Sequence, residues 1–346
     1  MAPAEVSAWR CAALATAFAS GAILTHLYHR RLSLRSPDQC AAPQSLPPNA
    51  LFAAVELGGT SCRAALAFAD DPAKLIDTTE VRTTDPHTTL SHIVRFLRTH
   101  APFVSLGVAS FGPVDLDRSS KTYGYVTSSN KPGWRQTDVL SYFKEFNVPI
   151  AFDTDVNAPA IAEMRYGNHT GDSCAYITVG TGIGVGLVVN SQPVHGLAHP
   201  EGGHMMPLRR ENDQYPGWLT DHPMSVESMA SAKACADRAG VEPANLPSVP
   251  DDHPAWDDVA YYLAQLCFTI CVIASPHVIV LSGGVMKRAI LFEKIRTHFK
   301  KINNEYLLLD KLTTNIDEYI VPSGYGNNIG IIGAIELARR VANGIK

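Results

Sequence analysis

The stretch LFAAVELGGTSCRAALAF, residues 51–68, decides the fold of this chain. An apolar run over residues 51–57 breaks at Gly58 and Gly59 and resumes over residues 62–68, which predicts two strands joined by a glycine turn. The same plan recurs later, where strands are expected over residues 175–179 and 184–189 around a second glycine cluster. The two halves of the chain therefore suggest one lobe built twice.

Strands and helices alternate along the rest of the chain. Further strands are expected over residues 104–111, 149–152, 278–281 and 319–321. Helices are expected near residues 156–166, 226–238 and 256–274, and from residues 86, 286 and 329 onward. Because the strands are expected to pair both ways, the pattern predicts an α/β architecture with mixed sheets.

The composition indicates a folded chain that does not bind polyanions in general. With 346 residues, of which 46% are hydrophobic, the chain is long enough for about two domains and apolar enough for a buried core. Lys and Arg number 29 against 33 Asp and Glu, a net charge of −4, so no nucleic-acid partner is expected. Seven cysteines without a C-x-x-C pair predict neither a disulfide framework nor a zinc ribbon.

The first 49 residues are expected to be a leader that precedes the fold. Residues 11–28 (CAALATAFASGAILTHLY) carry no charge and are followed by Arg30, Arg31 and Arg35. This run is slightly short for a spanning helix, so a membrane anchor, a signal peptide, a transit peptide and a leader without catalytic importance all remain open. Residues 36–49 are rich in proline and indicate a linker. If the segment spans, the positive-inside rule leaves the catalytic part in the cytoplasm.

Three glycine clusters, each directly after an apolar strand, carry the strongest chemical signal. They occupy residues 56–60 (ELGGT), 180–186 (GTGIGVG) and 282–285 (SGGV). Glycine lets successive N–H groups converge on phosphate oxygens, and Thr60 and Thr181 each add a hydroxyl donor. Each cluster taken alone is equally compatible with an ordinary tight turn. A Rossmann site is excluded because residues 180–186 lie between two strands, and a P-loop because its motif is absent.

The segment FDTDVN, residues 152–157, places a carboxylate where a strand ends and a helix begins. Ligands of open α/β sheets bind at such strand ends. Phosphoryl transfer to an alcohol needs a carboxylate that takes the hydroxyl proton, and Asp155 is the candidate base. Only one of Asp153 and Asp155 is expected to face the cleft. Asp155 is also well placed to cap the following helix, and both roles remain open.

A second polar cluster, HPEGGH at residues 199–204, lies in a Gly/Pro-rich loop after a strand. Side chains of such loops face ligands more often than the core, and carboxylates and imidazoles are suitable hydrogen-bond partners for a polyol. Glu201 and His204 are therefore candidate sugar contacts, which Glu227 joins from the start of a helix. A structural role remains the alternative. As a zinc site, His204 and His222 lack two further ligands.

The order of these motifs resembles the sugar kinases of the ROK family, most closely the bacterial-type fructokinase branch. The resemblance covers nearly all of residues 51–342 and rests on ELGGT (56–60), SFGPVD (110–115), a stretch over 123–134 ending KPGW, TDVNA (154–158), YITVGTGIG (176–184), HPEGGH (199–204) and LSGGVM (281–286). It implies a two-lobed, actin-like and hexokinase-like fold of the ribonuclease H-like ATPase class, which closes on ATP and a hexose. The expected parts are a small lobe at residues 50–153, a large lobe at 154–328 and a C-terminal helix at 329–346 that returns to the small lobe.

The resemblance also assigns roles to individual residues. Asp155 is expected to be the catalytic base, and the expected sugar contacts are Glu201, His204, Glu227 and Asn157. The expected phosphate and nucleotide contacts are Gly58, Gly59, Thr60, Gly180, Thr181, Gly182, Gly283, Gly284, Val285 and Met286. Glu56 either orients Mg²⁺ through water or stabilises the first turn. The family also favours a homodimer.

The chain departs from the family pattern at a zinc site. The fructokinase branch usually binds zinc through two histidines, which match His204 and His222, and two cysteines. Here the cysteine positions hold Leu219 and Ser225, so we expect that structural zinc is lost.

The loop over residues 205–226 must then be held by packing, for which Trp218 and Tyr215 are the candidates. A second departure is Ser61, which follows the first glycine turn where the family usually has lysine. It removes one expected cationic contact to phosphate.

Together these observations predict an ATP- and Mg²⁺-dependent hexose 6-phosphotransferase without zinc, most simply one that phosphorylates D-fructose at its 6-hydroxyl. Asp155 takes the proton. Kinases for glucose, mannose or N-acetylmannosamine are the alternatives within the enzyme class. A catalytically silent sugar-binding protein, tethered by its leader, is the alternative from another class.

Overall fold

The computed structural model describes residues 46–345 apart from residues 48 and 130. Segment 11–28, with its alternatives as an anchor or a targeting signal, lies outside the described residues and stays a prediction. Within the described part, helix α6 (Ala255–Ala274) is long and apolar enough to cross a membrane. Its Trp256, Leu263 and Leu266 are buried in the core, which accounts for its apolar composition without a membrane.

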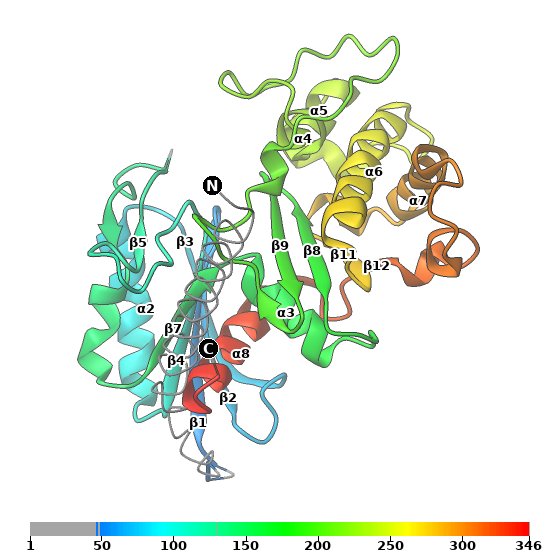
Figure 1. Ribbon diagram of the computed structural model, residues 1–346. Helices are drawn as coiled ribbons and strands as arrows, with labels where there is room; N and C mark the ends of the chain where they lie inside the picture. The colour runs from blue at the N-terminus through cyan, green and yellow to red at the C-terminus, as the bar shows by residue number, and fades with distance from the viewer. Residues whose placement is uncertain (1–45, 48, 130, 346) are drawn as a thin grey trace, which may run out of the picture. The chain divides into compact units, whose positions relative to one another are not determined.

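The stretch over residues 51–68 forms two antiparallel strands of a five-stranded mixed sheet, as predicted (Figure 1). In the order in which they lie, its strands are β3 (Leu75–Arg82), β2 (Ser61–Phe68), β1 (Leu51–Leu57), β4 (Ser105–Ser110) and β7 (Ile150–Thr154). β1, β4 and β7 are parallel, while β2 pairs antiparallel with both neighbours. Side chains alternate between two cores along β1, with Phe52 on one face and Val55 on the other.

The second predicted strand pair lies in another five-stranded mixed sheet. Its strands, in order, are β10 (Gln192–Pro193), β9 (Ile183–Val189), β8 (Cys174–Val179), β11 (Val278–Ser282) and β12 (Ile320–Pro322). β8, β11 and β12 are parallel, and β9 pairs antiparallel with β8 and β10. A separate hairpin joins β5 (Tyr125–Val126) to β6 (Thr137–Asp138). The predicted α/β class with mixed sheets is confirmed.

Helices cover both faces of each sheet. They are α2 (Pro86–His100), α3 (Asn157–Tyr166), α4 (Val226–Ala230), α5 (Ala232–Ala239), α6, α7 (Ile290–Asn303) and α8 (Ile329–Ala342). Short 3-10 helices are η1 (Leu140–Phe146), η2 (Gly202–His204), η3 (Pro243–Ser248), η4 (Val285–Lys287), η5 (Asp310–Leu312), η6 (Ile316–Glu318) and η7 (Gly326–Asn328). α2 packs on the first sheet, and α4, α6 and α7 share a core with the second.

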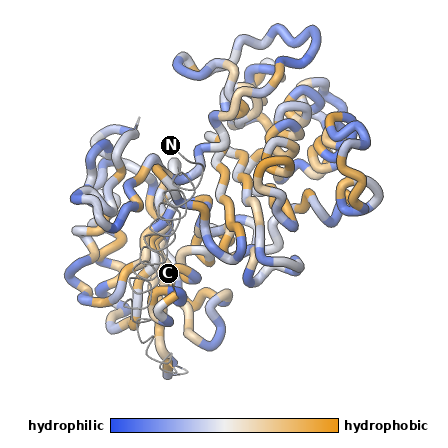
Figure 2. The backbone as a smooth tube through the Cα atoms, in the orientation of Figure 1, coloured by the Kyte–Doolittle hydropathy of each residue, from blue (hydrophilic) through white to orange (hydrophobic). Residues whose placement is uncertain are grey.

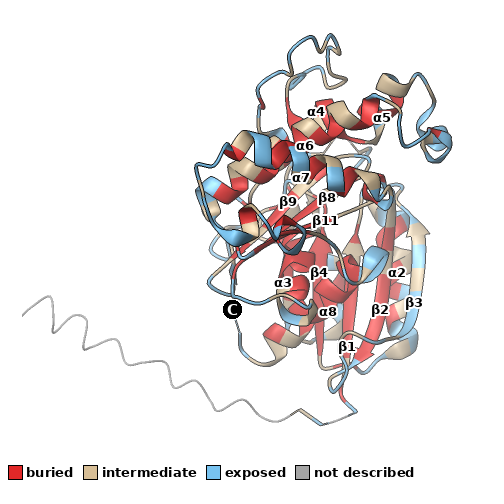
Figure 3. Cartoon of the chain, turned by 90° about the vertical axis from the view of Figure 1, so that its right-hand side faces the viewer, coloured by how far each residue is buried: buried red, intermediate tan, exposed pale blue. Residues whose placement is uncertain are grey.

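Helices α3 and α8 occupy the core between the two sheets (Figure 1). This middle core takes Phe52 from β1, Tyr176 from β8 and Ile335 from α8. The hydroxyl of Ser105 on β4 donates to the carbonyl oxygen of Ala338 at 2.8 Å, which fixes α8 to the first sheet. Figure 3 shows the central strands of both sheets buried and the edge strand β3 largely exposed. Figure 2 shows the same division in hydropathy, with apolar strands and a hydrophilic loop before α4.

Two elements differ from the sequence-based expectation. The helix expected near residues 226–238 is broken at Ser231 into α4 and α5. The helix expected from residue 286 begins only at Ile290, after the 3-10 turn η4. At the first break, the amide of Ala232 donates to the carbonyl oxygen of Gly180 in the second glycine cluster. The 3-10 turn η4 directly follows Gly283 and Gly284 of the third cluster.

Candidate active site

The first two glycine turns meet across the two sheets. Gly58 and Gly59 follow β1, and the amide of Gly58 donates to the carbonyl oxygen of Ser61 at 3.1 Å. In the second turn, the amide of Gly180 donates to the carbonyl oxygen of Gly182 at 2.9 Å. The hydroxyl oxygens of Thr60 and Thr181 lie 3.4 Å apart, although 121 positions separate them in the sequence. The structure therefore brings both predicted phosphate-binding turns to one place.

The second turn is held by the broken helix. Glu227 on α4 accepts a hydrogen bond from the amide of Ile183 at 2.7 Å, directly after the turn. The break at Ser231 frees the amide of Ala232, which donates to the carbonyl oxygen of Gly180 at 2.8 Å. A Cβ atom on Gly182 would lie 2.6 Å from the Glu227 carboxylate, so glycine is needed for this contact. Glu227, predicted as a sugar contact, thus has one oxygen committed to the turn.

Asp155 lies directly after β7, at the end of a parallel strand. Its amide donates to the carbonyl oxygen of Ser110 at 2.9 Å, which fixes its backbone to β4. The residue that caps α3 is Val156, and α3 has no side-chain cap, so the alternative role of Asp155 as a helix cap is wrong. The pKa of Asp155 is raised to about 7: burial is the largest cause, the negative charge of Glu201 adds to the rise, and the positive charge of Lys131 opposes it. Such a pKa suits a general base at neutral pH.

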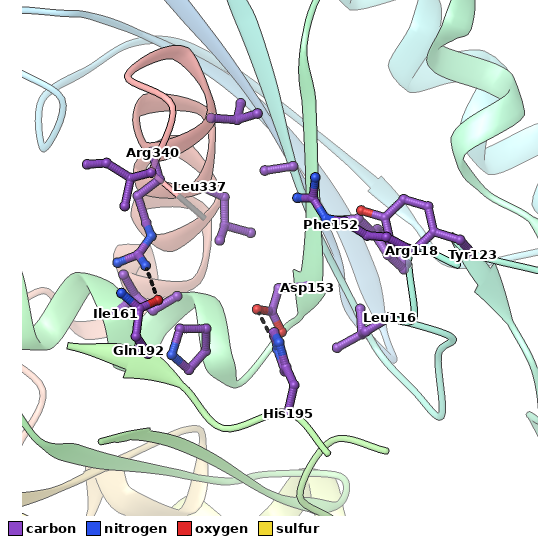
Figure 4. Close-up of a pocket in the computed structure, with 14 residues that line it drawn as sticks. Leu116, Arg118, Tyr123, Phe152, Asp153, Ile161, Gln192, His195, Leu337 and Arg340 are labelled. Atoms are coloured by element: carbon purple, nitrogen blue, oxygen red, sulfur yellow. Dashed lines mark hydrogen bonds and ion pairs between the residues drawn. The ribbon is translucent and has the colours of Figure 1, made fainter. Parts of the chain in front are cut away.

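Asp153, two positions before Asp155, lines a cavity to which Asp155 does not contribute. This cavity of about 340 Å³ is lined by Asp153, Arg118, His195 and Arg340, among others (Figure 4). Asp153 accepts from the His195 ring at 3.0 Å on one oxygen and from the Asn157 amide at 3.0 Å on the other. Asp155 is absent from this lining. Residues two positions apart on a strand share a face, and Asp155 departs from that pattern because β7 ends at Thr154.

The prediction that Asn157 contacts the sugar needs correction. Its side chain is fully buried. The amide nitrogen donates to Asp153, and the amide oxygen accepts from the backbone of Leu187 at 3.2 Å. With both polar atoms used inside the core, Asn157 joins β7 to β9 and offers nothing to a ligand.

The loop over residues 199–204 contacts the segment that follows β4 of the first sheet. His199 is buried, and its ring accepts from the amide of Val114 at 3.1 Å, so the SFGPVD and HPEGGH motifs are in direct contact. Burial raises the pKa of Glu201, which His199 and His204 lower and Glu227 raises. Because Glu201 in turn raises the pKa of Asp155, the predicted sugar contacts and the predicted base share one electrostatic environment.

His204 and His222 meet as the zinc pattern predicts, with their Nδ1 atoms 2.9 Å apart. The cysteine positions offer no ligand: Leu219 is aliphatic, and the Ser225 hydroxyl donates to the carbonyl oxygen of His222 and caps α4. In the described part of the chain, no three His, Cys, Asp or Glu side chains form a group that fits a metal ion. The loss of structural zinc stays a prediction.

The loop over residues 205–226 is held by the aromatic residues that the sequence suggested. The indole of Trp218 donates to Ser231 at 2.9 Å, and the hydroxyl of Tyr215 donates to Asp237 at 2.9 Å. Sequence reasoning missed a stronger anchor, the ion pair between Asp213 and Arg238 at 2.8 Å, in which both side chains are only 4% exposed. No local signal marks this pair, because its members lie 25 positions apart.

Glu56 is a buried carboxylate near the first turn. One of its oxygens has no hydrogen-bond partner among the described residues, and the nearest cation, on Arg63, is 3.7 Å away. The pKa of Glu56 is raised to about 7: burial is the largest cause, Arg63 opposes the rise, and the charges of Asp155 and Glu80 add to it. A Cβ atom on Gly330 would collide with this carboxylate, so glycine at the start of α8 makes room for it. An orphaned carboxylate oxygen beside a phosphate-binding turn fits a hydrated Mg²⁺, which keeps several waters and few protein ligands.

The third glycine cluster follows β11. Gly283 has φ +98°, and a Cβ atom there would collide with the backbone of Val179 on β8. Gly284 has φ −60°, and a Cβ atom there would meet nothing within 4 Å. Val285 and Met286 are buried in the core of the second sheet, so their side chains are not exposed to a nucleotide and only their backbone groups remain as contacts.

These neighbouring glycines allow a paired test of the nucleotide site. Gly283→Ala is expected to lower the melting temperature, because the residue has positive φ and no space for Cβ. Gly284→Ala is expected to keep the wild-type melting temperature while it raises the KM for ATP, because the methyl group fills the space that a nucleotide would approach. An unchanged KM in Gly284→Ala would remove this residue from the nucleotide site.

Lys131 is a site residue to which sequence reasoning assigned no role. Its ammonium group donates to the carbonyl oxygen of Gly59 in the first turn at 2.8 Å. The KPGW stretch that contains it was a visible signal, but nothing in its spacing indicates where the lysine points.

The sequence profile of the ROK family matches residues 52–341. The chain belongs to the ROK family. A putative fructokinase from Bacillus subtilis is 38% identical over 292 residues, which cover 84% of this chain and 96% of that protein. A fructokinase from Zymomonas mobilis is 37% identical over 306 residues, which cover 85% and 98%.

Solved structures of the ROK family share the fold. A glucokinase from Streptomyces griseus, in complex with glucose and AMPPNP, aligns with a TM-score of 0.65 at 20% identity and covers 84% of this chain and 99% of its own. A hexokinase from Thermus thermophilus aligns with a TM-score of 0.64 at 21% identity and covers 83% and 97%. The predicted two-lobed, hexokinase-like fold is therefore confirmed.

Proposed function

We propose that this protein transfers the γ-phosphoryl group of ATP to a hexose, and that the hexose is D-fructose. One observation carries the proposal: the hydroxyls of Thr60 and Thr181 meet at two glycine turns, in a site whose half-buried carboxylate Asp155 has a pKa near neutrality. The turns supply donors for phosphate, and the carboxylate supplies a base for an alcohol. Membership of a sugar-kinase family and fructokinase relatives at 37–38% identity support it.

In the proposed reaction, Asp155 accepts a hydrogen bond from the 6-hydroxyl of the sugar. As the hydroxyl oxygen attacks, its proton moves to the Asp155 carboxylate and an oxygen–phosphorus bond forms. The bond between the γ-phosphorus and the bridging oxygen breaks, and ADP leaves with that electron pair. Glu201, His204 and the free oxygen of Glu227 are the groups that would orient the sugar. Backbone amides of both turns and the hydroxyls of Thr60 and Thr181 would hold the phosphates.

Glu56 is the residue that would hold Mg²⁺, through water. When bound, the ion neutralises charge on the phosphates of ATP. Burial disfavours the charged form of the Glu56 carboxylate, and one of its oxygens has no hydrogen-bond partner among the described residues. A hydrated Mg²⁺ beside it would stabilise that charge and so reduce the free-energy cost of burying it.

A coupled assay of ADP release by the full-length chain tests the proposal, with fructose, glucose, mannose and N-acetylmannosamine compared. Fructose is expected to give the highest kcat/KM, by about tenfold or more over the others, within the range that pocket contacts can achieve. A higher value for another hexose would retain the kinase and replace its substrate. Sugar binding without ADP release from any hexose would favour the silent sugar-binding alternative.

A further inference from the structure

Lys131 is presented to the site by a rigid turn. The ring of Trp134, three positions later, is fully buried, packs edge-on against Phe111 at 5.0 Å between ring centroids, and donates its indole N–H to the carbonyl oxygen of Thr84 at 2.6 Å. The amide of Trp134 donates to the carbonyl oxygen of Lys131 at 3.2 Å, which closes the turn. The buried tryptophan thus fixes the backbone from which the lysine extends.

The Lys131 side chain crosses Phe111 and ends at the first glycine turn. Its ammonium lies 5.3 Å from the centroid of the Phe111 ring and donates to the carbonyl oxygen of Gly59 at 2.8 Å. A Cβ atom on Gly59 would lie 3.2 Å from the ammonium, so glycine at this position permits the close approach. The ring and the carbonyl oxygen hold the charge beside Thr60, whose hydroxyl faces Thr181.

The positive charge of Lys131 is not matched by a carboxylate in contact with it. No salt bridge to Lys131 occurs within the described residues, and the ammonium donates to a neutral carbonyl oxygen, that of Gly59. An ammonium has three donors, and the bond to Gly59 uses one, so two can reach another acceptor. The residues that form the first turn, Glu56 to Ser61, contain no cation. Lys131 therefore supplies the positive charge that this turn lacks.

We propose that Lys131 is a catalytic residue that contacts the γ-phosphoryl group of the nucleoside triphosphate during its transfer. This inference rests on the proposed function. The lysine keeps its proton throughout: the hydroxyl proton of the acceptor goes to Asp155, the new oxygen–phosphorus bond forms, and ADP takes the electrons of the broken bond. The ammonium stabilises the charge on the phosphoryl oxygens while the phosphoryl group passes from the bridging oxygen of ATP to the hydroxyl oxygen of the acceptor.

The test compares Lys131→Gln, Lys131→Arg and a control, Lys121→Gln, which alters an exposed lysine ten positions earlier. Steady-state kinetics with ATP and the hexose that wild type turns over best are measured for all three full-length variants. Loss of one charged donor to a transition state costs about 10²–10³ in kcat, so Lys131→Gln is expected to lose about 100-fold. Lys131→Arg retains the charge and is expected to keep a much larger share of kcat, while Lys121→Gln matches wild type.

The dependence of kcat/KM on pH separates a catalytic charge from a structural contact. Glu201, Glu56 and Lys131 are the charged groups that act on Asp155 or lie beside it. Without Lys131, the acid limb is expected to move to higher pH, because the lysine charge lowers the pKa of Asp155. Lys131→Arg keeps the positive charge and is expected to leave that limb in place, so the limb reports whether the charge reaches the site. Melting temperatures of the three variants identify any loss of folding.

Three results would overturn the inference. If the kcat of Lys131→Gln stays within about threefold of the wild-type value, Lys131 is not a catalytic residue, since the loss expected of one is far larger. Equal losses in Lys131→Gln and Lys131→Arg, with an unmoved acid limb, would leave Lys131 only a structural contact. If the wild-type protein phosphorylates no hexose, the proposed function is overturned and this inference falls with it. That outcome differs from a failure of the inference alone, in which wild type is active and only the predicted effect of the Lys131 variants is missing.

Discussion

An Asp155→Asn variant is expected to lose between about 10² and 10⁴ in kcat, the range that a general base contributes. Asparagine has the shape of aspartate and keeps a hydrogen-bond acceptor, but it cannot take the proton of the attacking hydroxyl. Binding of the sugar should therefore survive, and calorimetric titration with fructose measures it directly. Because burial raises the pKa of Asp155 to about 7, wild-type kcat/KM should rise with pH through neutrality as the carboxylate ionises.

Asp153→Asn is the matched control. It alters the carboxylate two positions away, whose oxygens bind His195 and Asn157 at the cavity in Figure 4. This variant is expected to lose stability, because the His195 ion pair is broken, while it keeps most of its turnover. If Asp155→Asn kept more than about a tenth of the wild-type rate, Asp155 would not be the base, given the magnitude of that role.

A Glu56→Gln variant is expected to gain stability and lose turnover at the same time. The pKa of Glu56 is raised from 4.5 to about 7, so the folded chain holds the proton more tightly than the unfolded chain. The stability that the proton confers is complete below pH 4.5 and is lost as the pH rises through about 7. Glutamine does not ionise, so at pH 8 the variant should exceed wild type by about 3 kcal/mol in its free energy of unfolding, a gain expected to vanish near pH 4.

The same variant tests the magnesium role without an activity measurement. With ATP present, Mg²⁺ is expected to raise the melting temperature of wild type more than that of Glu56→Gln. Glu242→Gln, at an exposed glutamate that is not among the groups acting on Glu56, is the control and should behave as wild type. A Glu56→Gln protein that melts below wild type at pH 8 would instead show that the carboxylate stabilises the turn, which is the other role the sequence allowed.

Much of the fold was predictable because it depends on short-range patterns. Strand, glycine turn and strand follow one another within residues 51–68. Asp153 and Asp155 differ in surroundings because β7 ends at Thr154, between them, and not because side chains alternate along the strand. The break at Ser231 was not predictable from helical periodicity. It exists because the amide of Ala232 bonds to Gly180, more than 50 positions earlier, and such a partner leaves no trace in the local sequence.

The site was predictable as a set of motifs but not as a set of contacts. The motifs placed Thr60, Thr181 and Asp155 at strand ends, and the parallel strands within each mixed sheet bring such ends to one edge. Asn157 was misassigned because position in a motif does not reveal whether a side chain turns to the ligand or to the core. Lys131 was overlooked because it lies outside the glycine-turn motifs and reaches the first turn from a separate loop, 72 positions away in the sequence.

The position of α8 has a consequence for how the protein is made. The helix ends at Ala342, close to the C-terminus, and yet it fills the core between the two sheets. While a ribosome is still synthesising the chain, β1 and β4 are complete but the apolar face that α8 will cover stays bare. Neither sheet can finish its inner surface until α8 has emerged from the exit tunnel. The nascent polypeptide is thus most prone to aggregate just before that point, when the strands of both sheets have been made and the helix that covers them has not.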